Sequence, residues 1–531
     1  EKDESRLQEF LDNPEKSLWS IALPVMAGMA IQTMYSIVDM LFIGQLGGDS
    51  ITAVAFNMPL YFFVMGITFG VGTGLTSSIS RAIGAEDKKR VSLSDFAIGN
   101  RRLGPWVIAF SERASGESAW LILGLPGAAL MLGMVEIWTV VGCLSGIIFS
   151  WLLIAKKLRE ESGRYNAITL PDLFSKMHTD QTQAIRVLSS LIITFFFTFY
   201  VAAQFIGAGK VLDQTFGIDP LTGMLVGAVI IIFYTMLGGF FAVAWTDLFQ
   251  GVIMIGTLVV LPIVGFIELS SHSYQGSVID FSKLYGGETG FAAFSLALGG
   301  LSWGFGYMGQ PHLVTRYMAI NDPKNIKLSR KIAISWAVPA FFGALFIGLI
   351  GSKLILVGAI DIPSDSEKLM PLMATTLLPS WIAGIFISGA IAAMMSTADS
   401  QLLVASSVLS KDLYQSFIKR DASNSELLVV SRLLTFVIGA VAFAMAYSSN
   451  ELVFELVGYA WSGLGSSFGP ALLLSLWWRG TSQAGVLMGM ATGTLFTIYD
   501  ISSGLVTVRV TSFVLAFLAT IIGSILFPSH R

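Results

Sequence analysis

The chain has 531 residues and a formal net charge of −3, and only 13% of its residues are charged, whereas 54% are hydrophobic. Because soluble proteins carry about 25% charged residues, the mean hydropathy of +0.72 indicates that lipid is the solvent for most of the surface, as in a multi-pass protein of the cell membrane. The near-neutral charge argues against nucleic acid as a partner, and one cysteine with four scattered histidines excludes an internal disulfide and favours no transition-metal site.

Long apolar stretches recur along the whole chain. A helix needs about 20 apolar residues to cross the roughly 30 Å hydrocarbon layer of a bilayer. We therefore predict an all-α polytopic membrane protein with about 14 transmembrane helices. The predicted spans are residues 17–45, 51–83, 104–134, 136–156, 186–212, 219–240, 245–268, 292–318, 330–357, 374–409, 428–447, 451–478, 483–500 and 508–528.

Lys and Arg cluster in the loops that alternating spans place on one side of the membrane. Because basic loops stay in the cytoplasm, we predict that both chain ends are cytoplasmic and that the loop 269–291 is extracellular. The basic clusters are Lys2/Arg6/Lys16, Lys88/Lys89/Arg90/Arg101/Arg102, Lys156/Lys157/Arg159/Arg164, Arg316/Lys324/Lys327/Arg330/Lys331, Lys411/Lys419/Arg420/Arg432 and Arg479.

The first two spans, within residues 1–90, have motifs of their own. Residues 21–26, Asp39, residues 70–74 and residues 79–85 resemble the first two helices of the multidrug and toxic compound extrusion family. In that family the aspartate that matches Asp39 takes part in cation or proton coupling. Because only the first helices of that fold are present, we expect Asp39 to be inherited rather than functional. The segment indicates a fusion, whether natural, engineered or a gene-model artefact.

Two of the predicted spans contain dense helix-breaking sequences. Unwound backbone is tolerated at membrane depth only where it lines a cavity or binds a ligand. The alternative is that Gly and Pro serve helix packing. However, Glu112, Arg113 and Glu117 in the first of these spans would each cost kilocalories per mole in lipid unless paired or hydrated. The breaking residues are 111–118 and 124–127 in the first span, and 299–300 and 303–311 in the second.

The two interrupted helices occupy matching places in two halves of the chain. Five spans separate their starts, and an odd number of crossings inverts the second half. Such a pair indicates a transporter whose site lies near the middle of the membrane. The predicted order is the segment 1–90, a cytoplasmic junction 91–103, a first five-helix repeat 104–268, the loop 269–291, an inverted repeat 292–478 and two further helices in 479–531.

A series of motifs runs through the chain between residues 92 and 528. They are Ile98–Pro105, Arg113-Ala114-Ser115 with Trp120 and Gly124–Ala128, Thr169–Asp172, Phe240–Asp247, Trp303–Tyr307, Gly309–His312 and Met395–Thr397. Together they resemble the sodium:solute symporter family, and within it the sodium/proline symporters. The resemblance implies a LeuT-type fold, with two extra helices before and two after a five-plus-five core, and Na⁺ as the coupling ion.

The resemblance also implies a sodium site between the first interrupted helix and the eighth core helix. Ala114 and Glu117 would supply backbone carbonyls there. Ala393 would supply another carbonyl, and Ser396 and Thr397 would supply hydroxyls. An all-oxygen shell suits a hard cation, and the spacing of residues 393, 396 and 397 places them on one helical face. Without the resemblance, the Ser-Thr pair would indicate helix packing or backbone hydrogen bonding.

One position departs from the pattern of the family. Sodium/proline symporters commonly have an aspartate beside the cation site, where this chain has Gly116. Either Glu117 or Asp399 would substitute for it by neutralising a cation. Arg101, in the first motif, and Asp247 are further candidates for coupling or for the ion pathway. Asp247 follows a Gly-Gly-Phe-Phe turn near a predicted membrane boundary, so a simple helix cap is the alternative.

Aromatic residues match family positions near the amino-acid site. Proline has an apolar ring and a zwitterionic head, so an aromatic wall with helix-end dipoles suits it. The alternative is aromatic core packing or an interfacial belt. The spacing Gly304, Gly306, Gly309 spells GxGxxG, but no strand precedes it, so we discount a dinucleotide site. The substrate-binding candidates are Tyr200, Trp303, Tyr307 and Pro311, with Trp120 and Gln310 as neighbours.

These observations predict a sodium-coupled symporter that imports a small solute by alternating access, and they favour L-proline as that solute. The alternatives are another solute of the same family, such as a different amino acid, pantothenate or a sugar acid. Cation-coupled drug efflux through the first segment and a sensor that binds without transporting also stay open. No nucleophile–base set or metal cluster indicates an enzyme.

Overall fold

A computed structural model describes residues 97–528, apart from residues 273, 275, 450 and 504–507. By its contacts the chain divides into two units, Glu1–Lys88 and Lys89–Arg531. The predicted spans 17–45 and 51–83 and Asp39 lie outside the described residues, so their structure stays a prediction.

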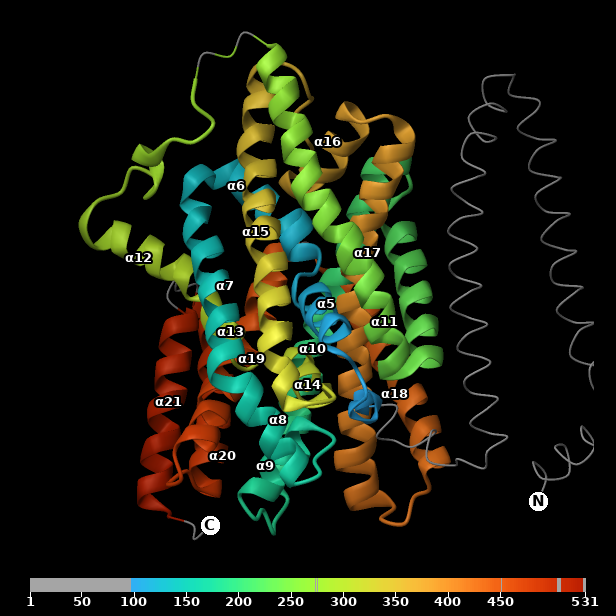
Figure 1. Ribbon diagram of the computed structural model, residues 1–531, viewed down its shortest axis with the longest axis vertical. Helices are drawn as coiled ribbons and strands as arrows, with labels where there is room; N and C mark the ends of the chain where they lie inside the picture. Colours follow the sequence, from blue (N-terminus) through green and yellow to red (C-terminus); the bar gives the residue numbers. More distant parts are fainter. Residues whose placement is uncertain (1–96, 273, 275, 450, 504–507, 529–531) are drawn as a thin grey trace, which may run out of the picture. The chain divides into compact units, whose positions relative to one another are not determined.

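Helices make up the regular structure of the described residues, apart from one isolated bridge between Leu103 and Ile320. Figure 1 shows most of them running side by side in one bundle. The α-helices are α5 (Pro105–Gly116), α6 (Leu125–Leu132), α7 (Ile137–Phe149), α8 (Ala155–Arg164), α9 (Leu170–Met177), α10 (Ala184–Phe216), α11 (Pro220–Ser271), α12 (Gly290–Leu301), α13 (Trp303–Gly306), α14 (Pro311–Ala319), α15 (Ile326–Leu356), α16 (Leu369–Leu377), α17 (Ser380–Val408), α18 (Asn424–Ser448), α19 (Val453–Trp477), α20 (Gln483–Ser503) and α21 (Val508–Leu526). The other helical turns are π in η3 (Trp120–Gly124), η5 (Ser150–Ile154) and η9 (Leu409–Ile418), and 3-10 in η2 (Gly99–Arg101), η4 (Gly133–Glu136), η6 (Phe281–Lys283), η7 (Pro323–Asn325) and η8 (Ser366–Lys368).

Within the described residues, seven helices are long and apolar enough to cross a membrane, or eight if the bent pair 290–306 and 311–319 is one span. The predicted pair of spans 219–240 and 245–268 corresponds to α11, which bends at Gly239. The backbone there has φ 65° and ψ 177°, a conformation that glycine adopts without the penalty other residues incur.

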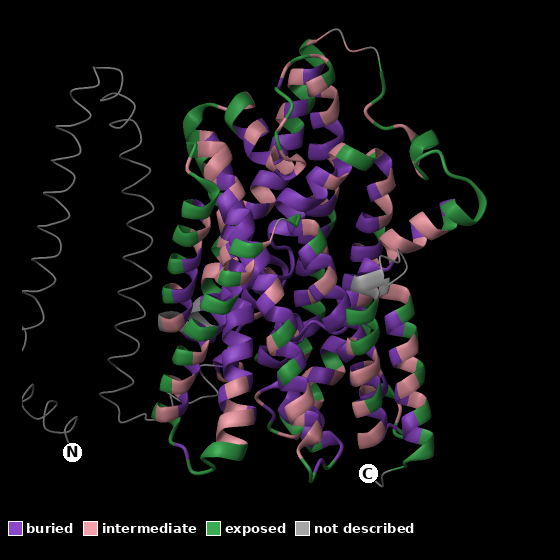
Figure 2. Cartoon of the chain, turned by 180° about the vertical axis from the view of Figure 1, so that it is seen from behind, coloured by how far each residue is buried: buried purple, intermediate pink, exposed green. Residues whose placement is uncertain are grey.

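Large apolar side chains cover much of the outer surface of the bundle. On α11, Ile263 and Phe266 are 54% and 55% exposed, and on α18 Leu433 is 61% exposed. Figure 2 shows that the buried residues lie along the inner helices. An exterior of this kind fits lipid as the surrounding solvent, because hydrocarbon carries no penalty for exposed apolar groups.

The helix α5 lies in the middle of the bundle, packed against α11, α14, α15 and α17 (Figure 1). Helix α7 approaches α12 and α13 closely at small residues. A Cβ atom on Gly304 would lie 2.4 Å from the carbonyl oxygen of Gly142, and one on Gly300 would lie 2.6 Å from Trp138. Glycine at these positions therefore lets the backbones of α7 and α12–α13 meet, as small residues do in membrane helix pairs.

Candidate functional site

The first interrupted helix unwinds at Glu117 and Ser118. Helix α5 ends at Gly116, and the backbone of Glu117 has φ −105° and ψ 69°. The break is narrower than the predicted range, because residues 111–116 form the last turns of α5 and the Gly-Leu-Pro-Gly sequence at 124–127 is helical. Pro126 lies in the first turn of α6, which continues directly from the π-helical turn η3.

The second interruption lies between α13 and α14. The chain unwinds at residues 307–310, and the helices on either side are bent by 42°. The predicted break at Gly299-Gly300 is wrong, since both glycines lie inside α12. Pro311 begins α14, so the predicted Gly-Gln-Pro sequence ends the break.

The predicted cation ligands of α5 and α17 lie together. Ser396 Oγ donates hydrogen bonds to the carbonyl oxygens of Ala114, at 2.9 Å, and Ala393, at 3.1 Å. Thr397 Oγ1 donates instead to the carbonyl of Ser115, at 3.0 Å. All four predicted residues are fully buried. Carbonyls and hydroxyls with no nitrogen or sulfur among them form the donor set that Na⁺ requires.

Glu117 is predicted to offer its backbone carbonyl, and its side chain forms an ion pair. Its carboxylate lies 2.6 Å from Arg113 Nη1 and accepts from the hydroxyl of Tyr307 at 3.0 Å. Arg113 also pairs with Glu112, with 2.6 Å between Arg113 Nε and Glu112 Oε2. The three charged side chains are fully buried, so the pairing expected for charges in this span is confirmed. We call Glu112, Arg113 and Glu117 the acidic triad.

Asp247 is paired rather than serving as a helix cap. It lies inside α11, fully buried, and its Oδ2 lies 3.1 Å from Arg316 Nη2. The hydroxyls of Ser111 and Ser115 donate to the same oxygen at 2.6 and 3.2 Å. The prediction that Arg316 belongs to a cytoplasmic basic loop is therefore wrong, because the side chain is fully buried within α14.

Asp399 of α17 lies near Asp247 and Arg316. Its Oδ1 accepts from Ser400 Oγ at 3.2 Å, and Ser400 Oγ lies 2.9 Å from Ser115 Oγ. Asp399 Oδ2 is fully buried and has no hydrogen-bond partner among the described residues. Of the two substitutes for the missing aspartate, Glu117 thus joins the acidic triad, and Asp399 joins the cluster around Asp247 and Arg316.

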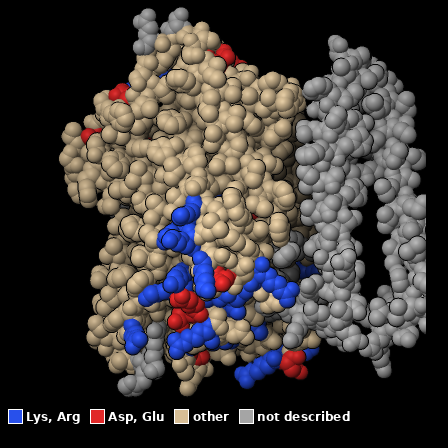
Figure 3. Space-filling view, in the orientation of Figure 1, with Lys and Arg blue, Asp and Glu red and all other residues tan. Residues whose placement is uncertain are grey.

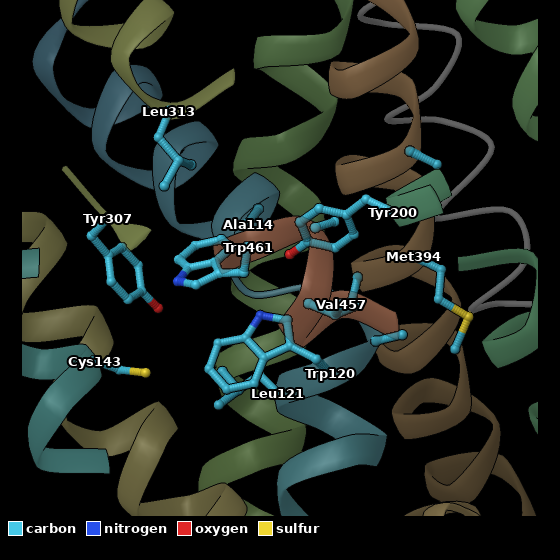
Figure 4. Close-up of a cluster of buried hydrophobic side chains, with 14 of the residues drawn as sticks. Ala114, Trp120, Leu121, Cys143, Tyr200, Tyr307, Leu313, Met394, Val457 and Trp461 are labelled. Atoms are coloured by element: carbon cyan, nitrogen blue, oxygen red, sulfur yellow. The ribbon is translucent and has the colours of Figure 1, made fainter. Parts of the chain in front are cut away.

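Three of the predicted substrate residues, Trp120, Tyr200 and Tyr307, lie in one cluster of buried side chains beside the first break (Figure 4). The rings of Trp120 and Trp303 stack at 5.0 Å between centroids. Tyr200 lies 3.4 Å from the hydroxyl of Ser118. Pro311 and Gln310 are buried at the start of α14, where Gln310 Nε2 donates to the carbonyl of Trp461 at 3.1 Å.

Trp461 of α19 is the residue of this aromatic cluster that the sequence analysis missed. Its ring lies 4.7 Å from Tyr307 and 6.3 Å from Tyr200, and its Nε1 donates to the carbonyl of Trp303 at 3.0 Å. A Cβ atom on Gly306 would lie 1.8 Å from the same nitrogen, so the GxGxxG glycines serve close packing. The available signal was a tryptophan among glycines and serines in the middle of a predicted span.

A cavity of about 530 Å³ is lined in part by Trp303. Its lining includes Glu136, Glu455 and Arg509. The guanidinium of Arg509 lies 4.2 Å from the centroid of the Trp303 ring. Trp303 therefore contacts both this cavity and the packed aromatic cluster of Trp120 and Trp461.

Arg101 lies away from these groups. Its Nη2 donates to the carbonyls of Ser162 and Ala167, both at 2.8 Å, which closes the end of α8. Burial, with the nearby charge of Arg159 adding to it, lowers the pKa of the Arg101 guanidinium. The structure thus brings Arg101 to a loop and not to the interrupted helices.

Comparison with known proteins identifies the family. The model of the family described as "Sodium:solute symporter family" matches residues 96–493. The chain belongs to the sodium:solute symporter family. The model described as "MatE" matches residues 24–95, so both resemblances predicted from the motifs are confirmed.

The relatives of this symporter chain are transporters. The osmoregulated proline transporter OpuE of Bacillus subtilis is 35% identical over 450 residues, which are 83% of this chain and 90% of the relative. Sodium/proline symporter 2 of Staphylococcus saprophyticus is 39% identical, over 77% of this chain and 80% of the relative. The sodium/proline symporter of Escherichia coli is 37% identical, over 77% and 82%.

Solved structures show the same fold. A Na⁺-coupled sialic acid symporter, in a substrate-bound outward-open state, aligns with a TM-score of 0.66 at 18% identity, over 84% of this chain and 95% of that chain. A nucleobase-cation-symport-1 family transporter in a closed conformation aligns with a TM-score of 0.51 at 13% identity, over 82% and 96%. The chain is an all-helical polytopic membrane transporter with a LeuT-like fold.

Proposed function

We propose that this chain is a sodium-coupled symporter that imports a small solute, L-proline, by alternating access. The observation that carries the proposal is the adjacency of two sites at the first break. An all-oxygen donor set at Ala114 and Ser396 lies on one side of α5's last turn, and the aromatic cluster lies just beyond it. Relatives named as proline transporters, at 35–39% identity, support proline as the solute.

In the proposed site, Na⁺ binds to oxygens of α5 and α17. The carbonyls of Ala114 and Ala393 each lie within hydrogen-bond distance of the Ser396 hydroxyl. Thr397 and the backbone of Glu117 would complete the shell. A bound Na⁺ would accept the lone pairs of these oxygens, with the Ser396 hydroxyl hydrogen turned away from the ion, and would hold α5 against α17. Asp247 and Asp399 would supply negative charge near the ion.

The proposed solute site lies among the aromatic side chains. Trp303 and Trp120 would cover the apolar ring of proline, and the residues near the second break would receive its polar head. Helix α14 begins at Pro311. Its N-terminus carries a partial positive charge, which would favour the negatively charged part of that polar head. The proposed substrate residues are Tyr200, Trp303, Tyr307, Pro311, Trp120 and Gln310, to which the structure adds Trp461.

The proposed architecture keeps the predicted domain order. Repeats over 104–268 and 292–478 would form an inverted five-plus-five core within about 14 membrane helices, with both chain ends in the cytoplasm. The distribution of charge supports this orientation. On the face shown in Figure 3, Lys and Arg gather at the end of the bundle that holds α8 and α9, which contain Lys156, Arg159 and Lys176.

Uptake of isotopically labelled proline into proteoliposomes tests the function. We expect accumulation with an inward sodium gradient, and its collapse when the gradient is removed or when choline replaces Na⁺. Unchanged uptake without sodium would reject the proposal. A competition panel of amino acids, pantothenate and sugar acids against labelled proline distinguishes another solute of the same family.

The match of residues 24–95 to the MatE model favours one second function, cation-coupled drug efflux. Its test is the substitution Asp39→Asn. Loss of drug resistance in cells that express the variant would support efflux. Unchanged resistance together with normal proline uptake would assign transport to the symporter unit alone.

A further inference from the structure

The cavity of about 530 Å³ lies between the helices α6, α12, α19 and α21. Sites for small molecules in proteins occupy roughly 300–1,000 Å³, so a small solute would fit. Its lining includes Ser366 of η8, next to α16, at the end of the bundle opposite α8 and α9 (Figure 1). Under the proposed orientation this is the extracellular end. Glycine forms part of the wall and leaves the space unfilled because it has no side chain, at residues 124, 127, 299, 300 and 458.

Arg509 of α21 is a half-buried cation on the wall of this cavity. Its Nη1 donates to the carbonyl oxygen of Gly299 at 3.3 Å, and the guanidinium lies 4.2 Å from the centroid of the Trp303 ring. A Cβ atom on Gly458 would lie 3.2 Å from its Nη2, so glycine there gives the guanidinium its room. No carboxylate of the described residues forms an ion pair with Arg509. Because a guanidinium stays charged and carries five N–H donors, most of these donors are available to a ligand.

Glu136 of η4 lines the same cavity and has a carboxyl oxygen without a partner. The side chain is 6% exposed, and its Oε2 has no hydrogen-bond partner among the described residues. Arg509 does not supply one, although both side chains line the cavity. A buried polar atom without a partner destabilises the structure until a hydrogen bond is made to it. A ligand that brings a donor to Glu136 is therefore favoured.

The two groups match different parts of one ligand. A guanidinium binds a carboxylate through two parallel hydrogen bonds, which add geometric specificity to the attraction of the charges. The oxygen of Glu136 requires a donor, and a protonated amine supplies one together with a positive charge. An α-amino acid carries both groups on one carbon atom. A carboxylate alone would leave Glu136 unpaired, and an amine alone would leave Arg509 unpaired.

We propose that this cavity is a second binding site for a zwitterionic amino acid, in which Arg509 binds the carboxylate and Glu136 accepts from the amine. The site is distinct from the aromatic cluster, since its lining includes Trp303 but neither Trp120 nor Tyr307. It gives α21, a helix outside the proposed five-plus-five core, a residue that binds solute. If the chain transports proline, the site holds the solute at the extracellular end before it reaches the aromatic cluster, and this step alone rests on the proposed function.

Equilibrium dialysis of labelled proline against the purified full-length protein counts the sites. We expect two bound molecules per wild-type chain at saturation. Arg509→Gln and Glu136→Gln should each weaken binding at one site by about 10- to 100-fold, the effect of losing one hydrogen bond to a charged group, and should leave the other site unchanged. Ser462→Ala is the matched control, because Ser462 lines the same cavity but its hydroxyl donates to the carbonyl of Gly458 at 2.6 Å. We expect this control to keep both sites.

A thiol on the cavity wall reports on this site directly. The native cysteine, Cys143, is fully buried, so Ser462→Cys adds the thiol that lines the cavity. Without Na⁺, proline should slow the reaction of this thiol with a methanethiosulfonate reagent. N-acetylproline, which lacks the N–H donor, and proline methyl ester, which lacks the carboxylate, should each require about 10- to 100-fold higher concentrations for the same protection. In Arg509→Gln the advantage of proline over its methyl ester should fall to within about threefold.

Wild-type affinity for proline at every site in both Arg509→Gln and Glu136→Gln would overturn the proposal. So would equal protection of the thiol by all three compounds, since neither Arg509 nor Glu136 would then contact the ligand. Arg509→Lys keeps the charge but not the paired donors; it should bind with an affinity between those of the wild type and Arg509→Gln, and it provides the test if Arg509→Gln does not fold. Failure of the proposed function gives a different result, in which vesicles accumulate no proline while proline still protects the thiol.

Discussion

Replacing Arg316 by glutamine removes the cation that faces Asp247 in the middle of the bundle. The guanidinium lies 3.1 Å from Asp247 Oδ2 and donates to the hydroxyls of Ser111 and Ser115 at 2.9 and 2.7 Å. All of these side chains are fully buried. Breaking a buried ion pair by removing one partner costs about 3–5 kcal/mol, because the other charge stays buried and unpaired. This corresponds to a change of roughly 10²- to 10³-fold or more in the unfolding equilibrium.

The assay is thermal unfolding of the purified full-length protein in detergent, for Arg316→Gln, Asp247→Asn and the double variant. If the two groups form one pair, the double variant loses less stability than the sum of the single variants, by about 2 kcal/mol. Losses that add to within about 0.5 kcal/mol would refute the pairing. Arg159→Gln is the control, because this partly exposed arginine donates to the carbonyls of Ile320 and Asn321 and not to a carboxylate, and we expect a loss of about 1 kcal/mol.

Two further predictions concern the cation site and the aromatic cluster. Ser396→Ala removes a hydroxyl that contacts two carbonyls, and should raise the half-saturating sodium concentration for proline uptake by about tenfold. Thr397→Ala should raise that concentration less. An unaltered half-saturating sodium concentration in Ser396→Ala would contradict the assignment of the cation site. Gly306→Ala places a Cβ atom 1.8 Å from Trp461 Nε1, and should lower stability by about 3 kcal/mol through overpacking. Gly384→Ala, whose Cβ would have nothing within 4 Å, should match the wild type, and equal stability of the two variants would contradict the packing at Gly306.

The sequence alone located the two interrupted helices but not their limits. Proline, glycine and buried charge mark where a membrane helix is weakest, so both breaks lie inside the predicted ranges. The limits differ because helix geometry is decided by neighbours. A π-helical turn, η3, carries the chain from the first break to Pro126, and Gly299-Gly300 stays helical where α7 packs against it.

Arg316 shows why the ion clusters were harder to predict. Counting basic residues by loop assigns each of them to a side of the membrane, and Arg316 is near the end of a predicted span. Its partner Asp247 is 69 residues away in the sequence, and no periodicity relates two helices so far apart. Trp461 was missed for the same reason, since its contacts with Tyr307 and Trp303 form only when α19 packs against α13.

The charges around the first break bear on how ion and solute are coupled. In each of two buried clusters, two carboxyl groups share one guanidinium: Asp247 and, through Ser400, Asp399 share Arg316, and Glu112 and Glu117 share Arg113. Both clusters contact the last turns of α5, which also holds Ala114. Under the proposed function Na⁺ binds at Ala114, and an added cation is favoured there because a buried carboxylate is costly until it is paired. The same ion would hold α5 against α17 beside the aromatic cluster, so Na⁺ and solute would each bind more tightly when the other is present. This coupling free energy would link solute uptake to the sodium gradient.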